Sequence, residues 1–321
     1  MRSLLLFVLF TSLALLSPFV GAVELKLSDI LDPTHLSHQI FFEIRLPRMI
    51  LGFCGGMILA LGGLVFQTLF RNALMTPYTL GISSGAVLGA GLAIKLGIGF
   101  VVFGVSAVSL FGFLGALATL GLLLYLARFL QNSHSESLLL LGIALSLFFT
   151  SALMILFYLG NSVQNDMLLR FTMGSLSILG YREPLIILFL SLILLVVLYL
   201  YRFELSLLGV SDEGAMLRGV DTKKVTITLL LILSLGVGVL VSITGPIGFV
   251  GLIIPHIVSK IYPSSIQHRI GKTALFGGFF LLFCDTVARS ITSQSELPIG
   301  IVTALIGGPF FVYLIITKGR A

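Results

Sequence analysis

The sequence predicts a polytopic α-helical membrane protein with about ten transmembrane helices. Hydrophobic residues make up 57% of the 321 residues and charged residues only 10%, and the mean hydropathy is +1.14. A soluble domain is usually about one-quarter charged, so this composition excludes a chain whose main solvent is water. A helix needs about 20 apolar residues to cross the hydrocarbon core of a bilayer, and runs of that length recur along the whole chain.

The apolar runs are assigned to helices because they lack the alternation that strands of a membrane barrel show over about ten residues. Their ends are placed within about four residues. All of them form one transmembrane domain, residues 1–321. The predicted spans are 4–22, 47–70, 79–99, 101–127, 138–160, 184–201, 224–243, 247–262, 271–290 and 299–317.

The first run has two interpretations. One Arg, an apolar core and a Val-x-Ala ending at Ala22 resemble a signal peptide. The alternative is a first helix that the mature protein retains. In either case residue 23 emerges outside, and we expect residues 1–22 to be retained, chiefly because of the resemblance described below.

The distribution of Lys and Arg sets the orientation, since basic residues favour the cytoplasmic side. With the N-terminus inside, 12 basic residues fall in the cytoplasm and 7 fall outside. The loop 202–223 and the residue after it carry four of the cytoplasmic ones. Both termini and this loop are therefore predicted to be cytoplasmic.

Glycine is common, with 35 residues, and much of it lies inside the spans. Small residues four apart let helix backbones approach closely in lipid. The patterns Gly52-xxx-Gly56, Gly81-xxx-Gly85 and Gly85-xxx-Gly89 therefore predict close helix packing, and such helices could also slide between states. The two cysteines, Cys54 and Cys284, lie in predicted spans and are interpreted as small packing residues.

The chain carries no sequence motif for a power source or for catalysis. There is no phosphate loop, HExxH motif or nucleophile elbow, and a membrane enzyme would need clustered His or carboxylates that the sequence lacks. Carboxylates inside the membrane, which ion-coupled carriers use, are also few. Asp285 is the clear one, and we interpret it as a structural partner of Arg289 rather than as a proton relay. The energy for transport is therefore expected from outside this chain.

A short charged helix is predicted between two of the most apolar runs. Ser211 can serve as its N-cap, Asp212 and Glu213 place negative charge in its first turn, Arg218 lies in its last turn, and Gly219 can end it. A two-turn helix is not stable alone. Its apolar patch is expected to pack on something, and because a lipid-bound helix would prefer a basic polar face, docking to another protein is at least as well supported. The patch consists of Ala215, Met216 and Leu217.

Several stretches resemble the permeases of type II ATP-binding-cassette importers for iron–siderophores, haem and cobalamin. The resemblance runs nearly end to end, in the right order and spacing. It is carried by RLPRMILGFCGGMILALGGLVFQTLFRNALMTPYTLGISSGAVLGA (45–90), ESLLLLGIAL (136–145), LLGVSDEGAMLRGVD (207–221), GPIGFVGLIIPHIV (245–258) and CDTVARSITSQSELPIGIVTALIGGPFFVYLI (284–315).

This resemblance implies a fold of ten helices per subunit and a set of partners. It implies a second permease copy (a homodimer is expected and a heterodimer is open), a cytoplasmic ATPase dimer and an extracytoplasmic substrate-binding protein. The chain itself would bind no cofactor or metal, because ATP and Mg belong to the ATPase. Besides membrane lipid no other partner is implied, and nucleic acid is not one. The implied location is the bacterial cytoplasmic membrane.

The resemblance also assigns roles to residues. The helix from Ser211 to Gly219 corresponds to the coupling element that seats in the ATPase. Arg45, Arg48 and Arg289 fall where family members present basic residues to the binding protein. Exposed ion pairs are worth only about 0–1 kcal/mol each, so these three would orient and steer the partner more than hold it.

The resemblance further implies gate and path residues. Asn72 and Leu74, in FRNALMTP, correspond to the inner gate. The second gate segment corresponds to Ser135, Glu136 and Ser137, where this chain departs from the family by carrying Glu136 and lacking a following Arg. Pro246 and Pro255 frame a segment expected to have broken backbone beside the path, since such backbone needs protein or a cavity to cover it. His256 is interpreted as a packing or hydrogen-bonding residue rather than a haem ligand.

The expected function is import of a ferric-siderophore-type complex by alternating access, driven by the partner ATPase. Haem or cobalamin is the alternative cargo, because these cargoes share the scaffold. The competing class is an ion-coupled secondary transporter, which predicts uptake without any ATPase and loss of function on Asp285→Asn.

Overall fold

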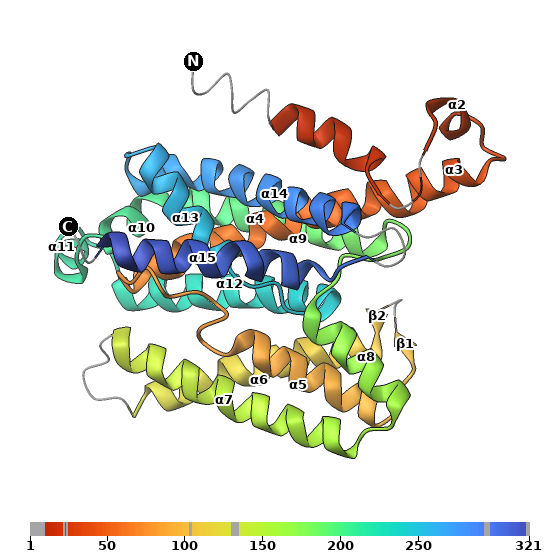
Figure 1. The fold of residues 1–321 in the computed structure, drawn as a ribbon. Helices are drawn as coiled ribbons and strands as arrows, with labels where there is room; N and C mark the ends of the chain where they lie inside the picture. Colours follow the sequence, from red (N-terminus) through yellow and green to blue (C-terminus); the bar gives the residue numbers. More distant parts are fainter. Residues whose placement is uncertain are drawn as a thin grey trace.

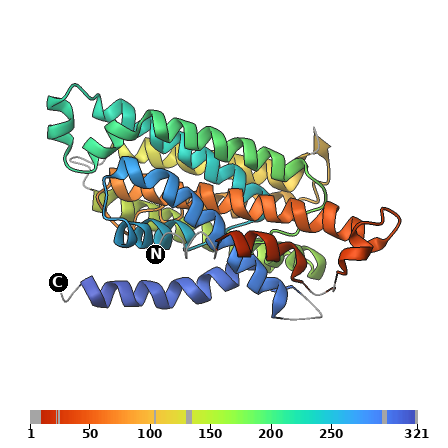
Figure 2. The same cartoon turned by 90° about the horizontal axis from the view of Figure 1, so that it is seen from above.

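The computed structural model describes residues 10–21, 23, 25–102, 105–129, 135–291 and 296–318. Within them the protein is a bundle of long helices that run roughly along one direction (Figures 1 and 2). The bundle helices are α4 Leu46–Leu69, α5 Ile82–Lys95, α6 Ala107–Ala127, α7 Ser135–Leu159, α9 Arg182–Leu200, α12 Thr222–Thr244, α13 Val250–Ile261, α14 Ile266–Ser290 and α15 Ile299–Lys318.

Shorter elements connect the bundle helices. They are η1 Ser17–Phe19, α2 Leu27–Ile30, α3 Leu36–Gln39, the π-helix η2 Ile40–Arg45, the two-residue strands β1 Val101–Val102 and β2 Val105–Ser106, α8 Ser162–Met173, α10 Arg202–Leu208 and α11 Asp212–Leu217. The strands pair antiparallel in a small hairpin. Helix α8 lies between the predicted spans 138–160 and 184–201 and was not predicted from the sequence. The hairpin occupies the start of the predicted span 101–127.

The ten predicted spans are each represented by an apolar helix. Six helices of the described chain are long and apolar enough to cross a membrane, and four shorter apolar helices correspond to the other spans, including Phe10–Phe19 at the start of the described chain. The predicted all-α polytopic fold is therefore confirmed.

Helix α4 lies at the centre of the bundle, in contact with α9, α12, α13 and α14. Its most apolar window is 83% buried, whereas that of α7 is only 17% buried. An apolar helix that its own chain leaves uncovered has to face lipid or another subunit. The core therefore forms around α4, and α7 lies at the periphery.

The predicted close packing at glycines is present. A Cβ built on Gly56 of α4 would lie 2.2 Å from the carbonyl oxygen of Gly277 in α14, and one on Gly89 of α5 would lie 2.1 Å from that of Phe111 in α6. Only glycine permits these backbone approaches. Cys54 and Cys284 are both free and buried, consistent with packing residues.

The bundle has two ends that carry different short elements (Figure 1). At one end lie α10, α11 and the end of α15; we call this the α11 end. At the other end lie α2, α3 and the β1–β2 hairpin; we call this the α2–α3 end.

Candidate functional site

Helix α11 is fixed at its N-terminus by a side-chain cap. Ser211 has extended backbone, and its Oγ accepts a hydrogen bond from the backbone N–H of Gly214 at 2.9 Å. Asp212 and Glu213 follow in the first turn, where negative charge is favourable. The N-cap that the sequence predicted is therefore confirmed. A six-residue helix is held in this way by its ends rather than by its own length.

The C-terminus of α11 closes at Gly219, as predicted. Gly219 has φ +81°, and its N–H donates to the Met216 carbonyl at 2.9 Å. The next N–H, of Val220, donates to the Ala215 carbonyl at 3.1 Å. A left-handed residue at this place satisfies carbonyls that a helix end leaves free.

The apolar patch of α11 is divided between two faces. Ala215 is fully buried, on the side where α11 contacts α10 and α12. Met216 is 58% exposed and Leu217 is 89% exposed. The three residues of the predicted patch therefore divide the work: Ala215 anchors the helix, and the two larger side chains point away from the chain's own core.

An ion pair joins α11 to the loop after α4. The Arg71 guanidinium lies 2.7 Å from the Asp212 carboxylate, and both groups are exposed. Such a pair is worth about 0–1 kcal/mol, so it orients the two segments more than it stabilises them. Glu213 and Arg218 are also exposed.

At the α2–α3 end, two arginines hold one buried carboxylate. Asp285 of α14 is fully buried. The Nε of Arg48, in α4, donates to its Oδ1 at 2.9 Å, and an Nη of Arg48 forms an ion pair with the same oxygen at 2.8 Å. Arg289, one turn further along α14, places Nε 3.0 Å from Oδ2 as an ion pair without a hydrogen bond. The predicted pairing of Asp285 with Arg289 is confirmed, and Arg48 is a second partner that the sequence did not indicate.

Arg48 also reaches a second carboxylate. It forms an ion pair with Glu296, whose carboxylate additionally accepts from the Ser177 hydroxyl at 3.2 Å. Burial alone would raise the pKa of Glu296, but the hydrogen bond and charge of Arg48 hold it below its usual range. The ion pair between Arg48 and Glu296 is therefore lost as pH falls, because Glu296 then becomes protonated.

Arg45 and Arg289 also bind the backbone of the N-terminal segment. Arg45 donates to the carbonyls of Pro18 and Val23, and Arg289 donates to the carbonyls of Ser17 and Val20. Residues 17–23 are thus tied to the start of α4 and the end of α14. No pattern of residue types could have shown this, because the acceptors are main-chain atoms.

The three arginines predicted to dock a binding protein are therefore buried in this chain. Arg45 is 6% exposed, Arg48 4% and Arg289 3%. The expectation that they are exposed was wrong, because Asp285, Glu296 and residues 17–23 already engage them.

The two predicted gate segments lie in different settings. Asn72 Oδ1 accepts from the Leu74 N–H at 2.9 Å, which forms a tight turn just after α4, and Leu74 is 37% exposed. In the second segment Ser135 begins α7, Glu136 is exposed and Ser137 is half-buried.

The backbone between α12 and α13 is broken, as Pro246 predicted. Gly245 has φ +69° and Phe249 has φ +68°, the latter a strained value for a residue with a large side chain. Tyr78 holds this irregular segment in place: its hydroxyl oxygen accepts a hydrogen bond from the backbone N–H of Ile247 at 2.6 Å. Pro255 does not bound the break; it lies inside α13, which corrects its predicted place.

Gln67 of α4 compensates for Pro255. A proline inside a helix leaves the carbonyl four residues earlier without its partner, and here that carbonyl belongs to Gly251. The side-chain amide of Gln67 donates to it at 3.0 Å. Sequence analysis missed Gln67, although a lone amide in an apolar run was the available signal.

Two cavities border the broken backbone. One, of about 210 Å³, lies between α4, the loop before α5 and α13; the other, of about 560 Å³, lies between α8, the broken segment before α13 and α15. Tyr78, Gly248 and Phe249 line both. This broken backbone is therefore covered by protein and cavity, as membrane depth requires.

No metal site accompanies these features in the part of the chain that the structure describes, where no three His, Cys, Asp or Glu residues cluster. The ring of His256 meets Phe310 edge-on, with centroids 6.2 Å apart.

Together, the apolar bundle, the broken helix beside cavities and the capped surface helix define a multi-span membrane transport protein. The profile of the FecCD transport family matches residues 4–317. The chain belongs to this family, whose members are permease subunits of ABC importers.

Individual relatives agree with this assignment. A probable iron chelatin transport system permease protein of Helicobacter pylori (strain ATCC 700392 / 26695) is 36% identical over 87% of this chain and 83% of its own. The hemin transport system permease protein HmuU of Yersinia pestis is 33% identical over 98% and 94%. A solved ABC transporter assigned to the metal-chelate type, in an inward-facing conformation, is 31% identical, covers 97% of each chain and superposes with a TM-score of 0.85.

Proposed function

We propose that this permease imports a ferric-siderophore-type complex by alternating access, with motion supplied by a separate ATPase. The observation that supports this proposal is the structure of α11. Its caps and Ala215 fix its backbone, while the exposed Met216 and Leu217 are left for a partner to cover. A ligand or nucleotide can shift a conformational equilibrium only through contacts that differ between the two states. The α11 surface is the place proposed for those contacts.

The α11 end is proposed to face the cytoplasm, with both termini. The basic residues of the loop 202–223 support this orientation. The α2–α3 end then faces the binding protein. We propose that the binding protein docks through Arg45, Arg48 and Arg289. Because these residues are buried, Glu296 and residues 17–23 must first move to uncover the guanidinium groups.

The cargo path is proposed to run past the broken backbone between two permease copies. The wider cavity lies against α15, and α15 runs along one side of the bundle (Figure 2). This placement leaves α15 and α8 for a second copy, which would enclose the cavity. Asn72 and Leu74, at the inner end of α4, and residues 135–137, at the start of α7, would close the path.

Residues 1–22 are proposed to be retained as a first helix. Cleavage after Ala22 would remove the carbonyls of Pro18 and of Ser17 and Val20, which accept from Arg45 and Arg289 respectively. Buried guanidinium groups without acceptors are costly.

Replacing Leu217 by Asp tests the proposed ATPase contact. The side chain is 89% exposed, so the free energy of unfolding should change by about 0.5 kcal/mol or less. Loss of an apolar anchor at an interface costs about 2 kcal/mol or more. We therefore expect the amount of co-purified ATPase to fall by at least about tenfold, together with uptake.

Leu179→Asp is the matched control, since Leu179 is 72% exposed in the loop before α9 and lies far from α11. It should retain the ATPase. Equal ATPase retention by the Leu217→Asp and Leu179→Asp variants would contradict the coupling assignment.

The cargo is tested by uptake into liposomes that hold the complete complex. Labelled ferric siderophore should accumulate with ATP, and labelled haemin and cobalamin should accumulate less. Relatives at 32–33% identity are named for molybdate, Fe(3+)-citrate and vitamin B12, so these solutes complete the panel. Preferred uptake of any of the others would replace the siderophore proposal, and uptake by the permease without its ATPase would replace the whole mechanism with ion coupling.

A further inference from the structure

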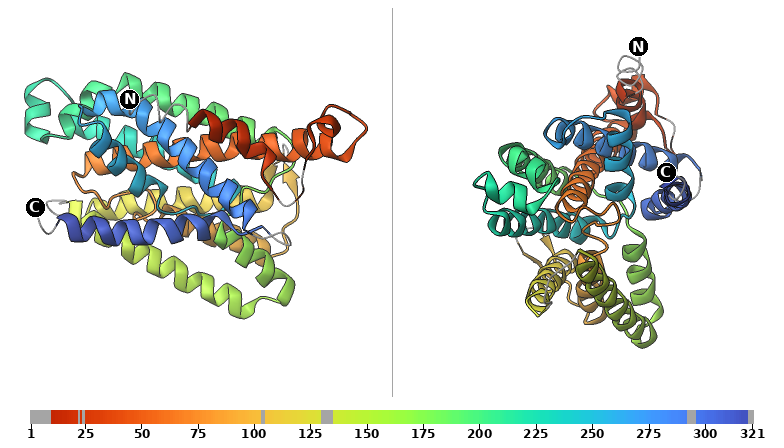
Figure 3. Two further views of the ribbon diagram at one scale, coloured as in Figure 1. Left: turned by 45° about the horizontal axis from the view of Figure 1, so that its top comes forward. Right: turned by 90° about the vertical axis from the view of Figure 1, so that its left-hand side faces the viewer.

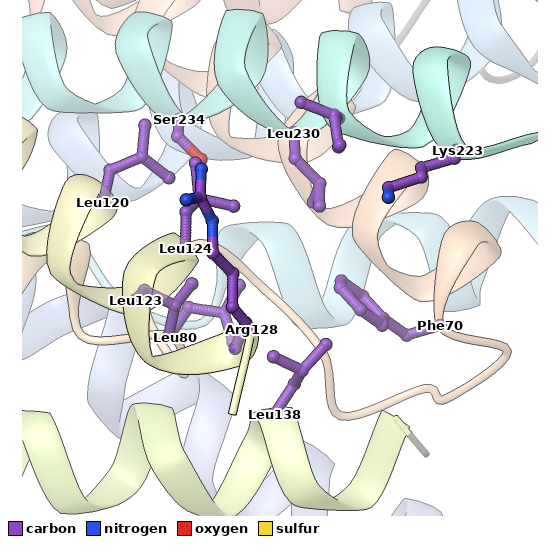
Figure 4. Close-up of a pocket in the computed structure, with 12 residues that line it drawn as sticks. Phe70, Leu80, Leu120, Leu123, Leu124, Arg128, Leu138, Lys223, Leu230 and Ser234 are labelled. Atoms are coloured by element: carbon purple, nitrogen blue, oxygen red, sulfur yellow. The ribbon is translucent and has the colours of Figure 1, made fainter. Parts of the chain in front are cut away.

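A separate cavity lies at the α11 end, on the side of the bundle away from α15. Its volume is about 610 Å³, and its walls come from α6 and α12, with the ends of α4 and α7 (Figure 4). Viewed along the bundle, α6 and α12 lie on one side and α15 on the other (Figure 3, right). The cavity shares no lining residue with the two that border the broken helix.

The walls of this cavity are mainly apolar. Leu120, Leu123 and Leu124 of α6 face Leu230 of α12, and Phe70 and Leu138 narrow the cavity at the ends of their helices (Figure 4). An apolar cavity of this size suits an alkyl chain.

Three polar groups interrupt the apolar lining. Arg128 follows the last turn of α6 and extends into the cavity, and Lys223 lies in the first turn of α12 with its charged end toward the cavity (Figure 4). No ion pair engages either cation within the described residues, and no carboxylate is among the lining residues.

The third group is the hydroxyl of Ser234. The residue is 2% exposed, and its Oγ makes no hydrogen bond within the described chain. A buried hydroxyl without a partner is costly, so this group indicates a missing acceptor or donor. Ser234 lies 11 residues beyond Lys223 on the same helix, a distance of about 16 Å along its axis.

We propose that this cavity binds one anionic phospholipid from the adjacent leaflet. The phosphate lies between Arg128 and Lys223, the Ser234 hydroxyl donates to a lipid oxygen, and an acyl chain packs along the leucines of α6. Basic pockets between transmembrane helices at the membrane surface suit acidic headgroups. The chemistry fits a lipid rather than a soluble anion, because the two unpaired cations stand over an apolar wall that continues into the membrane. The proposal requires only that the chain spans a bilayer.

The test uses the purified permease in neutral detergent, titrated with phosphatidylglycerol or with phosphatidylcholine. Native mass spectrometry counts bound lipid, and thermal unfolding measures stabilisation. Phosphatidylglycerol should bind at one molecule per chain and raise the unfolding midpoint, whereas phosphatidylcholine should do neither. Equal effects of the two lipids would overturn the proposal, and so would competition by inorganic phosphate or by a ferric chelate at equal strength.

Variants locate the site. The double variant R128Q/K223Q should bind phosphatidylglycerol about tenfold or more weakly, because it removes both cations that attract the acidic headgroup. The matched control R202Q/K224Q removes the same charges from the same end without touching the cavity lining, and it should bind as the wild type does.

The Ser234→Ala variant keeps the proposal testable if the double variant fails to fold. It removes a hydroxyl that has no partner in the chain, so the lipid-free midpoint should not fall. The shift produced by phosphatidylglycerol should nevertheless shrink. Wild-type lipid binding by both R128Q/K223Q and Ser234→Ala would overturn the proposal.

Discussion

Replacing Asp285 by Asn is expected to lower the free energy of unfolding by about 3–5 kcal/mol, because removing one partner of a buried ion pair leaves an uncompensated charge. In this protein the substitution would leave two buried positive charges, those of Arg48 and Arg289, without their shared carboxylate. Arg48 and Arg289, both nearly inaccessible to solvent, share this fully buried carboxylate. Asn keeps the shape and loses the charge, so Arg48 would keep Glu296 while Arg289 would keep only backbone carbonyls and the Ser17 hydroxyl.

The measurement is thermal unfolding of the purified chain in detergent, where the midpoint should fall by roughly 5–10 °C. Asp166→Asn is the matched control. Asp166 also pairs with an arginine one turn away, Arg170 at 2.8 Å, but both side chains are more than half exposed. Such a pair contributes about 0.3–0.5 kcal/mol. Equal midpoints for the Asp285→Asn and Asp166→Asn variants would show that the cluster does not stabilise the α2–α3 end.

This result changes how a transport assay on Asp285→Asn is interpreted. Loss of uptake alone cannot indicate ion coupling, because a destabilised subunit also loses uptake. Uptake normalised to folded protein separates the two causes.

The sequence was sufficient for the elements whose signals are local. The ten spans followed from apolar length, and the ends of α11 followed from Ser211 and Gly219, whose capping chemistry acts within a few residues. The break at Pro246 was local in the same sense. Each of these features is set by residues adjacent in the chain, so tertiary packing had little opportunity to override them.

The sequence was insufficient where distant segments meet. The burial of Arg45, Arg48 and Arg289 depends on the backbone of residues 17–23 and on Glu296, which no periodicity connects to them. The exposure of Met216 against the burial of Ala215 depends on how α10 and α12 meet α11. The cavity between α6 and α12 likewise arises from two helices far apart in sequence.

The second large effect is expected at Gly63, which the glycine patterns did not single out. A Cβ built on Gly63 of α4 would lie 1.7 Å from the carbonyl oxygen of Gly251 in α13. This is backbone, which cannot turn aside as a flexible side chain can. Gly63→Ala must therefore push α13 away from α4, and overpacking of this kind typically costs about 1–3 kcal/mol and occasionally more. The displacement would also stretch the hydrogen bond from Gln67 to the same carbonyl.

Gly121→Ala provides the matched control, because an added Cβ there meets no atom within 4 Å and the residue lies inside α6, away from both ends. Ala in a helix is favoured over Gly by about 0.5–1 kcal/mol, so this variant should be as stable as the wild type or slightly more so. Gly63→Ala should instead lower the unfolding midpoint and reduce the folded fraction on size exclusion. Because α13 begins at the broken backbone beside the proposed path, the folded remainder should also transport more slowly per molecule. Wild-type stability in Gly63→Ala would mean that α4 and α13 can separate freely, and the contact that positions the broken helix would then lie elsewhere.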